Sequence, residues 1–144
     1  LNNCLNEVLC SINSLIKKSK TTITIDFSKT NKILFKKSYL KSIFLNLITN
    51  AIKYAKPNTL PVITIRTERI NTDTKLIISD DGIGFDMEKV KDKVFGLYQT
   101  FNDHIDSHGI GLYLVHNQVT TLGGTITLES EVNQGATFTI TIKD

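Results

Sequence analysis

Residues 46–54 of the 144-residue chain read NLITNAIKY and indicate its fold more clearly than any other segment. They lie within residues 38–55, where apolar side chains recur at i, i+3, i+4, i+7 and i+8, a period that predicts an amphipathic helix. Asn46, Asn50 and Lys53 share a second, polar face of that helix. Asn is a mediocre helix former, so two of them in mid-helix need a reason. One reason is ligation of a hard cation such as Mg²⁺ by an amide oxygen, and the alternative is a solvated face.

Hydrophobic periodicity predicts the elements around this helix. Residues 3–18 and 111–122 are typical of helices, 86–94 of a short helix, and 95–108 of a long loop. Alternation of β-branched and apolar residues predicts six strands, at 21–27, 32–35, 62–69, 75–79, 125–129 and 136–143. Strands that follow one another in the sequence favour hairpins. We therefore expect an α+β two-layer sandwich, a mixed β-sheet with helices on one face.

Composition favours a soluble domain, with 40% hydrophobic residues and a formal net charge of +3. No apolar run is long enough for a transmembrane helix, and no signal peptide is visible. Cys4 and Cys10 are expected to be free thiols in a reducing compartment. The basic residues are scattered among acids and are not interleaved with aromatics, so they favour a solvated surface over nucleic-acid binding. Because the chain begins with Leu and not Met, we expect it to be a piece of a longer protein.

Two glycine-containing turns follow the polar helix. Residues 80–84, DDGIG, come directly after a predicted strand, and 109–112, GIGL, open a predicted helix. The first is either an ordinary β-turn or an acceptor carboxylate beside glycines that let a ligand ring approach the backbone. The second offers helix N-terminal amides, which attract phosphate. It is neither a P-loop nor a dinucleotide-binding turn, because the residues around it differ.

Taken in order, these motifs resemble the ATP-binding (Bergerat) fold of gyrase-type topoisomerases, heat-shock chaperones, mismatch-repair proteins and histidine kinases. The chain resembles above all the catalytic and ATP-binding domain of sensor histidine kinases, over roughly residues 20–143. The matching segments are an N box at 46–54, a G1 box at 80–84, an F box at 95–101, a G2 box at 109–112 and a closing strand at 135–138.

The resemblance implies roles on the polar helix. Asn50 would hold Mg²⁺, while Asn46 and Lys53 would lie along the phosphates. Tyr54 would pack against the nucleotide. In the ATPase relatives a Glu that activates water takes the place of Asn46. An amide cannot act as a general base, so we expect poor ATP hydrolysis and transfer to a positioned acceptor.

The resemblance also implies how the base and the lid are held. Asp80 would accept from the adenine amine, partly through a water supported by Thr137, and Gly82 and Gly84 would let the backbone approach the base. Asp81, where Asn is common, would place a second carboxylate near this pocket. The residues expected in or beside the phosphate-covering lid are Phe95, Tyr98, Phe101, Gly109, Ile110, Gly111 and Leu112.

The expected activity is that of a protein-histidine kinase domain that uses ATP and Mg²⁺. The family's acceptor histidine is missing, because His104, His108 and His116 all lie in or just after the lid. We therefore expect residues 1–19 to be the end of an upstream dimerisation or linker helix and 20–144 to be the kinase domain. The acceptor histidine would lie in the upstream domain, and a response regulator would take the phosphoryl group next. We expect a cytoplasmic domain without nucleic-acid or membrane contact, in a homodimeric parent that a membrane anchor would also suit. The alternatives are a nucleotide-binding regulatory module without transfer activity and an anti-sigma-type serine kinase.

Overall fold

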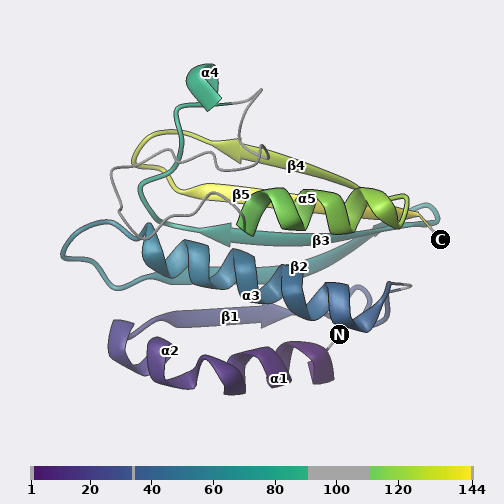
Figure 1. Cartoon of the computed structure of the whole chain (residues 1–144), viewed down its shortest axis with the longest axis horizontal. Helices are drawn as coiled ribbons and strands as arrows, with labels where there is room; N and C mark the ends of the chain where they lie inside the picture. The colour runs from purple at the N-terminus through teal and green to yellow at the C-terminus, as the bar shows by residue number, and fades with distance from the viewer. Residues whose placement is uncertain (1, 34, 91–110, 144) are drawn as a thin grey trace.

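The sheet of this computed structural model is mixed and has the strand order β1-β2-β3-β5-β4 within the described residues, 2–33, 35–90 and 111–143 (Figure 1). The strands are β1 (Thr22–Asp26), β2 (Val62–Ile70), β3 (Asp73–Asp80), β4 (Thr125–Ser130) and β5 (Ala136–Lys143). β1 runs parallel to β2, and the other neighbours are antiparallel. The short β2–β3 and β4–β5 connections are the hairpins that the sequence predicts.

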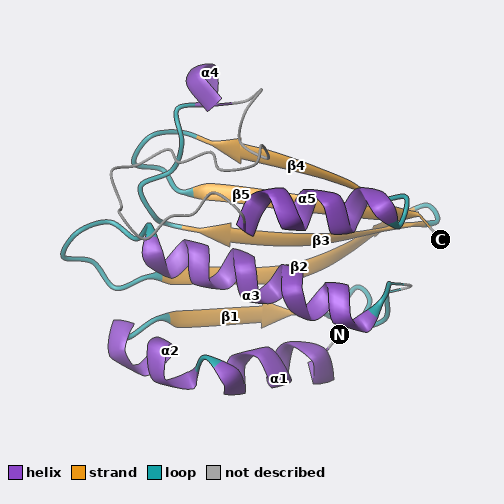
Figure 2. Ribbon diagram, viewed as in Figure 1, coloured by secondary structure: helices purple, strands orange, loops and turns teal. Residues whose placement is uncertain are grey.

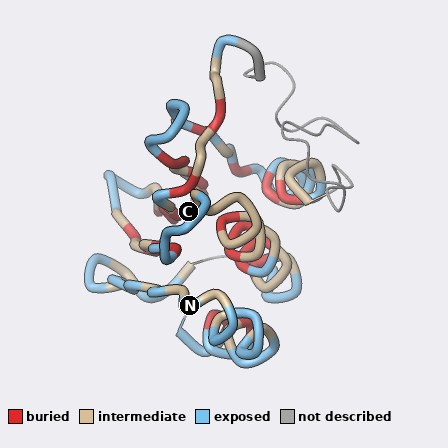
Figure 3. The backbone as a smooth tube through the Cα atoms, turned by 90° about the vertical axis from the view of Figure 1, so that its left-hand side faces the viewer, coloured by how far each residue is buried: buried red, intermediate tan, exposed pale blue. Residues whose placement is uncertain are grey.

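The helices of the described residues are α1 (Asn2–Ser11), α2 (Asn13–Ser19), α3 (Lys37–Lys53), α4 (Met87–Val90) and α5 (Gly111–Thr121). All but α4 lie on one side of the sheet (Figures 2 and 3). α3 and α5 lie side by side over the middle of the sheet, and α4 stands beyond the β4 edge (Figure 1). The predicted α+β sandwich with helices on one face is therefore confirmed. No helix within the described part of the chain is long and apolar enough to cross a membrane.

Side-chain alternation explains which face of the sheet is covered. The strand residues that point toward the helices are nearly all apolar, and Ile63, Ile65, Leu76 and Ile140 are at most 1% exposed. The opposite face of β1, β4 and β5 carries mainly threonines, which β-structure accommodates well. α3 adds the apolar stripe that its sequence predicts: Leu40, Ile43, Phe44, Leu47, Ile48 and Ala51.

The strand predicted at 32–35 is wrong for the residues described there, Lys32, Ile33 and Phe35. The Phe35 N–H instead donates to the Ile33 carbonyl at 3.0 Å, and the Lys32 N–H donates to the Thr30 hydroxyl. These are local turn contacts. Ile33 and Phe35 give the segment the apolar alternation of a strand because both side chains pack against the core, although neither residue lies in the sheet.

The helix predicted at 3–18 is divided at Ile12 into α1 and α2. α1 packs into the main core, where Leu5 is fully buried and Cys4 and Val8 are 5% exposed. α2 contributes no buried residue. The division of the chain at residue 19 stays a prediction, but α1 shares its core with α3 and the sheet.

Candidate functional site

The end of α3 meets the turn that follows β3. The Tyr54 carbonyl, at the C-cap of α3, accepts the Ile83 N–H at 3.0 Å. A Cβ atom placed on Gly82 would lie 2.6 Å from that carbonyl oxygen, so this approach requires glycine. The fold thus brings together 46–54 and 80–84, two motifs that the sequence singled out.

Asp80 is the half-buried acid of this junction. It ends β3 on the helix-facing side of the sheet, and its Oδ1 accepts the Gly82 N–H at 2.8 Å. Burial raises the pKa of Asp80 from 3.8 to about 6, although hydrogen bonds from the Gly82 and Ala136 N–H groups lower it and nearby Asp81 raises it slightly. Near pH 7 the group is therefore mainly a carboxylate, an acceptor of hydrogen bonds in an apolar wall.

A small cavity lies between α3 and Asp80. Its walls are Asn50, Ala51, Tyr54, Asp80, Gly84, Phe85, Ala136 and Phe138. The cavity volume is about 10 Å³, which is the space of a single water molecule. A planar ring could enter only if the wall side chains moved apart. The lining combines apolar surface with one carboxylate and one amide, a composition typical of small-molecule sites.

Two predicted neighbours of Asp80 point elsewhere. Thr137 lies on the opposite face of the sheet, where its hydroxyl is 3.1 Å from that of Ser79. Because successive strand residues alternate, it is Ala136 that faces Asp80, and the role predicted for Thr137, supporting a water at Asp80, stays a prediction that this orientation does not favour. Asp81 is exposed and accepts the Val62 N–H at 3.0 Å, so it ties the turn to the start of β2.

The polar face of α3 carries the remaining predicted residues. The Asn46 amide nitrogen donates to the Ser42 carbonyl at 2.8 Å and to the Ser42 hydroxyl at 3.2 Å. Because a carbonyl can only accept, the Asn46 oxygen must face away from it, toward Gly111 at the start of α5. A Cβ atom on Gly111 would lie 3.2 Å from that oxygen. The Lys53 ammonium lies 5.7 Å from the centre of the Tyr54 ring.

Most residues of the predicted lid lie outside the part of the chain that the structure describes. Phe95, Tyr98, Phe101, Gly109 and Ile110 lie outside the described residues, as do His104 and His108, whereas Leu112 packs half-buried against the core. Within the described ranges no group of three or more His, Cys, Asp or Glu could hold a metal ion. The residues present still suit a magnesium nucleotide, since Asn50 supplies an amide oxygen beside the cavity and Asp80 an acceptor within it.

Sequence reasoning missed three walls of the cavity: Phe85, Ala136 and Phe138. The signal was available for β5, because alternation from buried Ile140 puts Phe138 and Ala136 on the Asp80 side and Thr137 on the other. For Phe85 the only hint was an aromatic residue directly after the glycine turn.

Comparisons with known proteins agree with this architecture. Residues 36–144 match the family described as histidine kinase-, DNA gyrase B- and HSP90-like ATPases. The heme sensor protein HssS of Staphylococcus saprophyticus is 34% identical over 142 residues, covering 92% of this chain and 30% of its own length. The chain thus spans less than a third of that curated relative.

Solved structures share the fold. The catalytic domain of the histidine kinase ThkA superposes with a TM-score of 0.82 at 23% identity, over 99% of this chain and 91% of that one. Full-length ShkA in complex with AMPPNP gives a TM-score of 0.78 at 21% identity, over 96% of this chain and 29% of that one. The chain therefore belongs to the family of histidine kinase-, DNA gyrase B- and HSP90-like ATPases, and its relatives include proteins named as sensor proteins and as histidine kinases.

Proposed function

We propose that this domain binds Mg-ATP between α3 and the 80–84 turn and transfers its γ-phosphoryl group to a histidine elsewhere in a longer parent protein. The observation that carries the proposal is the half-buried Asp80 carboxylate beside a cavity that Asn50 and Tyr54 also line. Two comparisons support it: curated relatives are named as sensor proteins, and the structure of ShkA holds AMPPNP.

Base recognition would depend on Asp80. Its carboxylate accepts hydrogen bonds, and the exocyclic amine of adenine donates them. Guanine presents a carbonyl at the same place, which would face the carboxylate with no proton between them. Gly82 and Gly84 would act indirectly: because they carry no side chain, the turn packs closely against the Tyr54 and Glu131 carbonyls, and this packing holds the backbone beside Asp80 in place.

The phosphate side would be served by α3. Asn50 offers an amide oxygen, the ligand type that Mg²⁺ accepts, and bound Mg²⁺ would supply positive charge to the phosphates. Lys53 would add an ammonium once it leaves the face of the Tyr54 ring. Asn46 presents only an acceptor oxygen toward α5, and an amide does not remove a proton from water. Binding with slow hydrolysis follows, which preserves the phosphoryl group for an acceptor.

Calorimetric titration with ATP and Mg²⁺ tests the binding site. We expect the wild-type chain to bind, Asp80→Asn to bind at least about tenfold more weakly because it loses a charged acceptor, and Asn50→Ala to lose the magnesium-dependent part of binding. Thr139→Ala, on the uncovered face of β5, is the control that should bind as the wild type does. Wild-type binding in both site variants would refute the assignment.

The partners belong to the parent protein. They are an upstream dimerisation domain that carries the acceptor histidine and a response regulator that receives the phosphoryl group, in a cytoplasmic part of a homodimer that a membrane anchor would suit. Incubation of the chain with labelled ATP and the parent's dimerisation domain tests transfer. We expect an acid-labile label on that domain, as phosphohistidine gives. An acid-stable label would favour a serine kinase, and tight binding without any label a regulatory module.

A further inference from the structure

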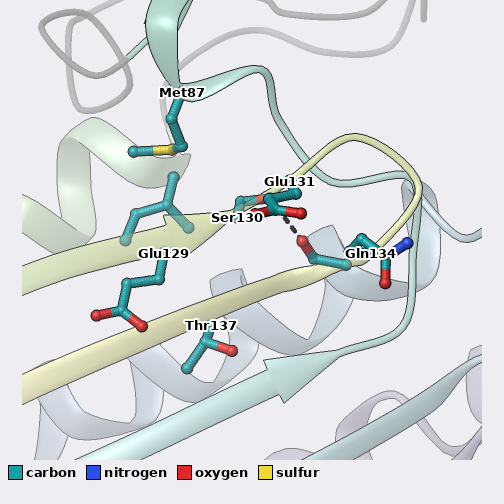
Figure 4. A pocket seen from close by; sticks show the side chains of 8 residues that line it. Met87, Glu129, Ser130, Glu131, Gln134 and Thr137 are labelled. Carbon is teal, nitrogen blue, oxygen red and sulfur yellow. Dashed lines mark hydrogen bonds between the residues drawn. The ribbon is translucent and has the colours of Figure 1, made fainter.

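Ser130, the last residue of β4, joins two segments that lie far apart in the sequence. Its hydroxyl accepts the Phe85 N–H at 2.8 Å. The same hydroxyl donates to the Gly135 carbonyl at 2.5 Å (dashed in Figure 4). A hydroxyl has one proton to donate, and here that proton is used toward Gly135 while a lone pair serves Phe85. No smaller side chain could make both contacts.

The rest of the 130–135 hairpin holds the same turn. The Asn133 N–H donates to the Ile83 carbonyl at 2.7 Å. Gly84, at φ +70°, lies so close to the hairpin that a Cβ atom would be 2.2 Å from the Glu131 carbonyl oxygen and 2.9 Å from the Ser130 hydroxyl. The turn after β3 is therefore clamped from the β4–β5 side as well as from α3.

Ser130 reaches the cavity only through other residues. The sheet register pairs it with Ala136, and Ala136 with Asp80, so the three side chains form a row on the helix-facing side. Phe85, whose N–H the hydroxyl accepts, is 7% exposed and forms a cavity wall. The Gly135 carbonyl belongs to the peptide whose N–H, that of Ala136, hydrogen-bonds Asp80. Ser130 itself lines a separate open hollow of about 450 Å³, together with Met87, Glu129 and Gln134 (Figure 4).

We propose that Ser130 is a positioning residue for the base pocket: its hydroxyl fixes the Phe85 backbone and the Gly135–Ala136 peptide on either side of Asp80. This assignment rests on the proposed nucleotide binding. Because the hydroxyl acts on the base side, its removal weakens ADP and ATP equally. A residue that acts on the terminal phosphate would weaken ATP more than ADP.

The experiment compares Ser130→Ala with a matched control, Ser79→Ala, which removes a hydroxyl from the opposite face of the same end of the sheet. ADP and ATP affinities are measured by calorimetry with Mg²⁺, and the exchange rate of the Phe85 amide by NMR. We expect Ser130→Ala to bind both nucleotides about tenfold more weakly and to exchange the Phe85 amide faster, because one charge-neutral hydrogen bond is lost on each side. Ser79→Ala should match the wild type in both measurements.

Wild-type affinity in Ser130→Ala despite faster Phe85 exchange would overturn the assignment, and so would an equal loss in Ser79→Ala. If the alanine variant does not fold, Ser130→Cys replaces it, since a thiol is a weaker donor of similar shape. Nucleotide affinity below that of the wild type then supports the assignment, and unchanged affinity overturns it. Failure of the wild-type chain itself to bind ADP or ATP would overturn the proposed function, and this assignment with it, by a result that does not involve Ser130.

Discussion

Asp80 combines a functional requirement with a cost in stability. Burial raises its pKa to about 6 in the folded domain, against 3.8 ordinarily. Between these values the folded state holds a proton that the unfolded chain has released. The free energy of unfolding therefore falls as pH rises from about 4 to about 6, by at most about 3 kcal/mol. The carboxylate that would select the base is thus disfavoured in the fold near pH 7.

Replacement of this acid by its amide should reverse that cost. We expect Asp80→Asn to raise the free energy of unfolding at pH 7 by about 1–2 kcal/mol, to remove most of the decline between pH 4 and 6, and to impair nucleotide binding. Urea unfolding at several pH values measures the first two effects. Asp81→Asn, one residue along and exposed, is the control in which the decline should persist. An Asp80→Asn variant that keeps the full decline would show that another group causes it.

The elements around the turn interlock through carbonyl groups, and glycine makes this possible. Gly84 combines a positive φ with contact against Glu131, whereas a Cβ atom placed on Gly123, at φ +81°, would meet no atom within 4 Å. We expect Gly123→Ala to lower the free energy of unfolding by about 1–2 kcal/mol, through backbone strain alone. Gly84→Ala should lower the free energy of unfolding by at least about 2 kcal/mol more, because the 130–135 hairpin must also move away from the new side chain. Parallel urea unfolding curves check this, and equal losses would mean that the hairpin contact is unimportant.

The bounds of α3 and of the long strands could be predicted from the sequence to within two residues. Burial of one face requires apolar residues at a regular spacing in these elements, and that spacing is visible in the sequence. The strand prediction at 32–35 failed because two apolar residues of a turn both pack against the core and so repeat with the period of a strand. At the site, Asp80 and Gly82 followed from the motif, but Ser130 did not, since its role depends on a pairing of β4 with β5 and a turn 45 residues away.

Helix α1 completes the hydrophobic core of the molecule. Leu5 is fully buried in the core that α3 and the sheet share, while exposed ion pairs join Glu7 to Lys37 and Lys41 and contribute little. We expect Leu5→Ala to lower the free energy of unfolding by about 2–5 kcal/mol, as cavities in rigid cores do. Leu15→Ala in α2, where the side chain is 37% exposed, should cost less than about 1 kcal/mol. Urea unfolding of both variants measures the difference, and equal costs would mean that α1 is no more part of the core than α2.

Removal of residues 1–19 tests the same point for the whole segment. If these residues were only the end of an upstream helix, the shortened chain would keep its cooperative unfolding transition unchanged. α1, however, supplies Cys4, Leu5 and Val8 to the core that α3 and the sheet share. Without them the apolar surface of that core would be open to water on one side, so we expect the shortened chain to lose the transition. Circular dichroism during urea unfolding measures it, with the full chain as the control.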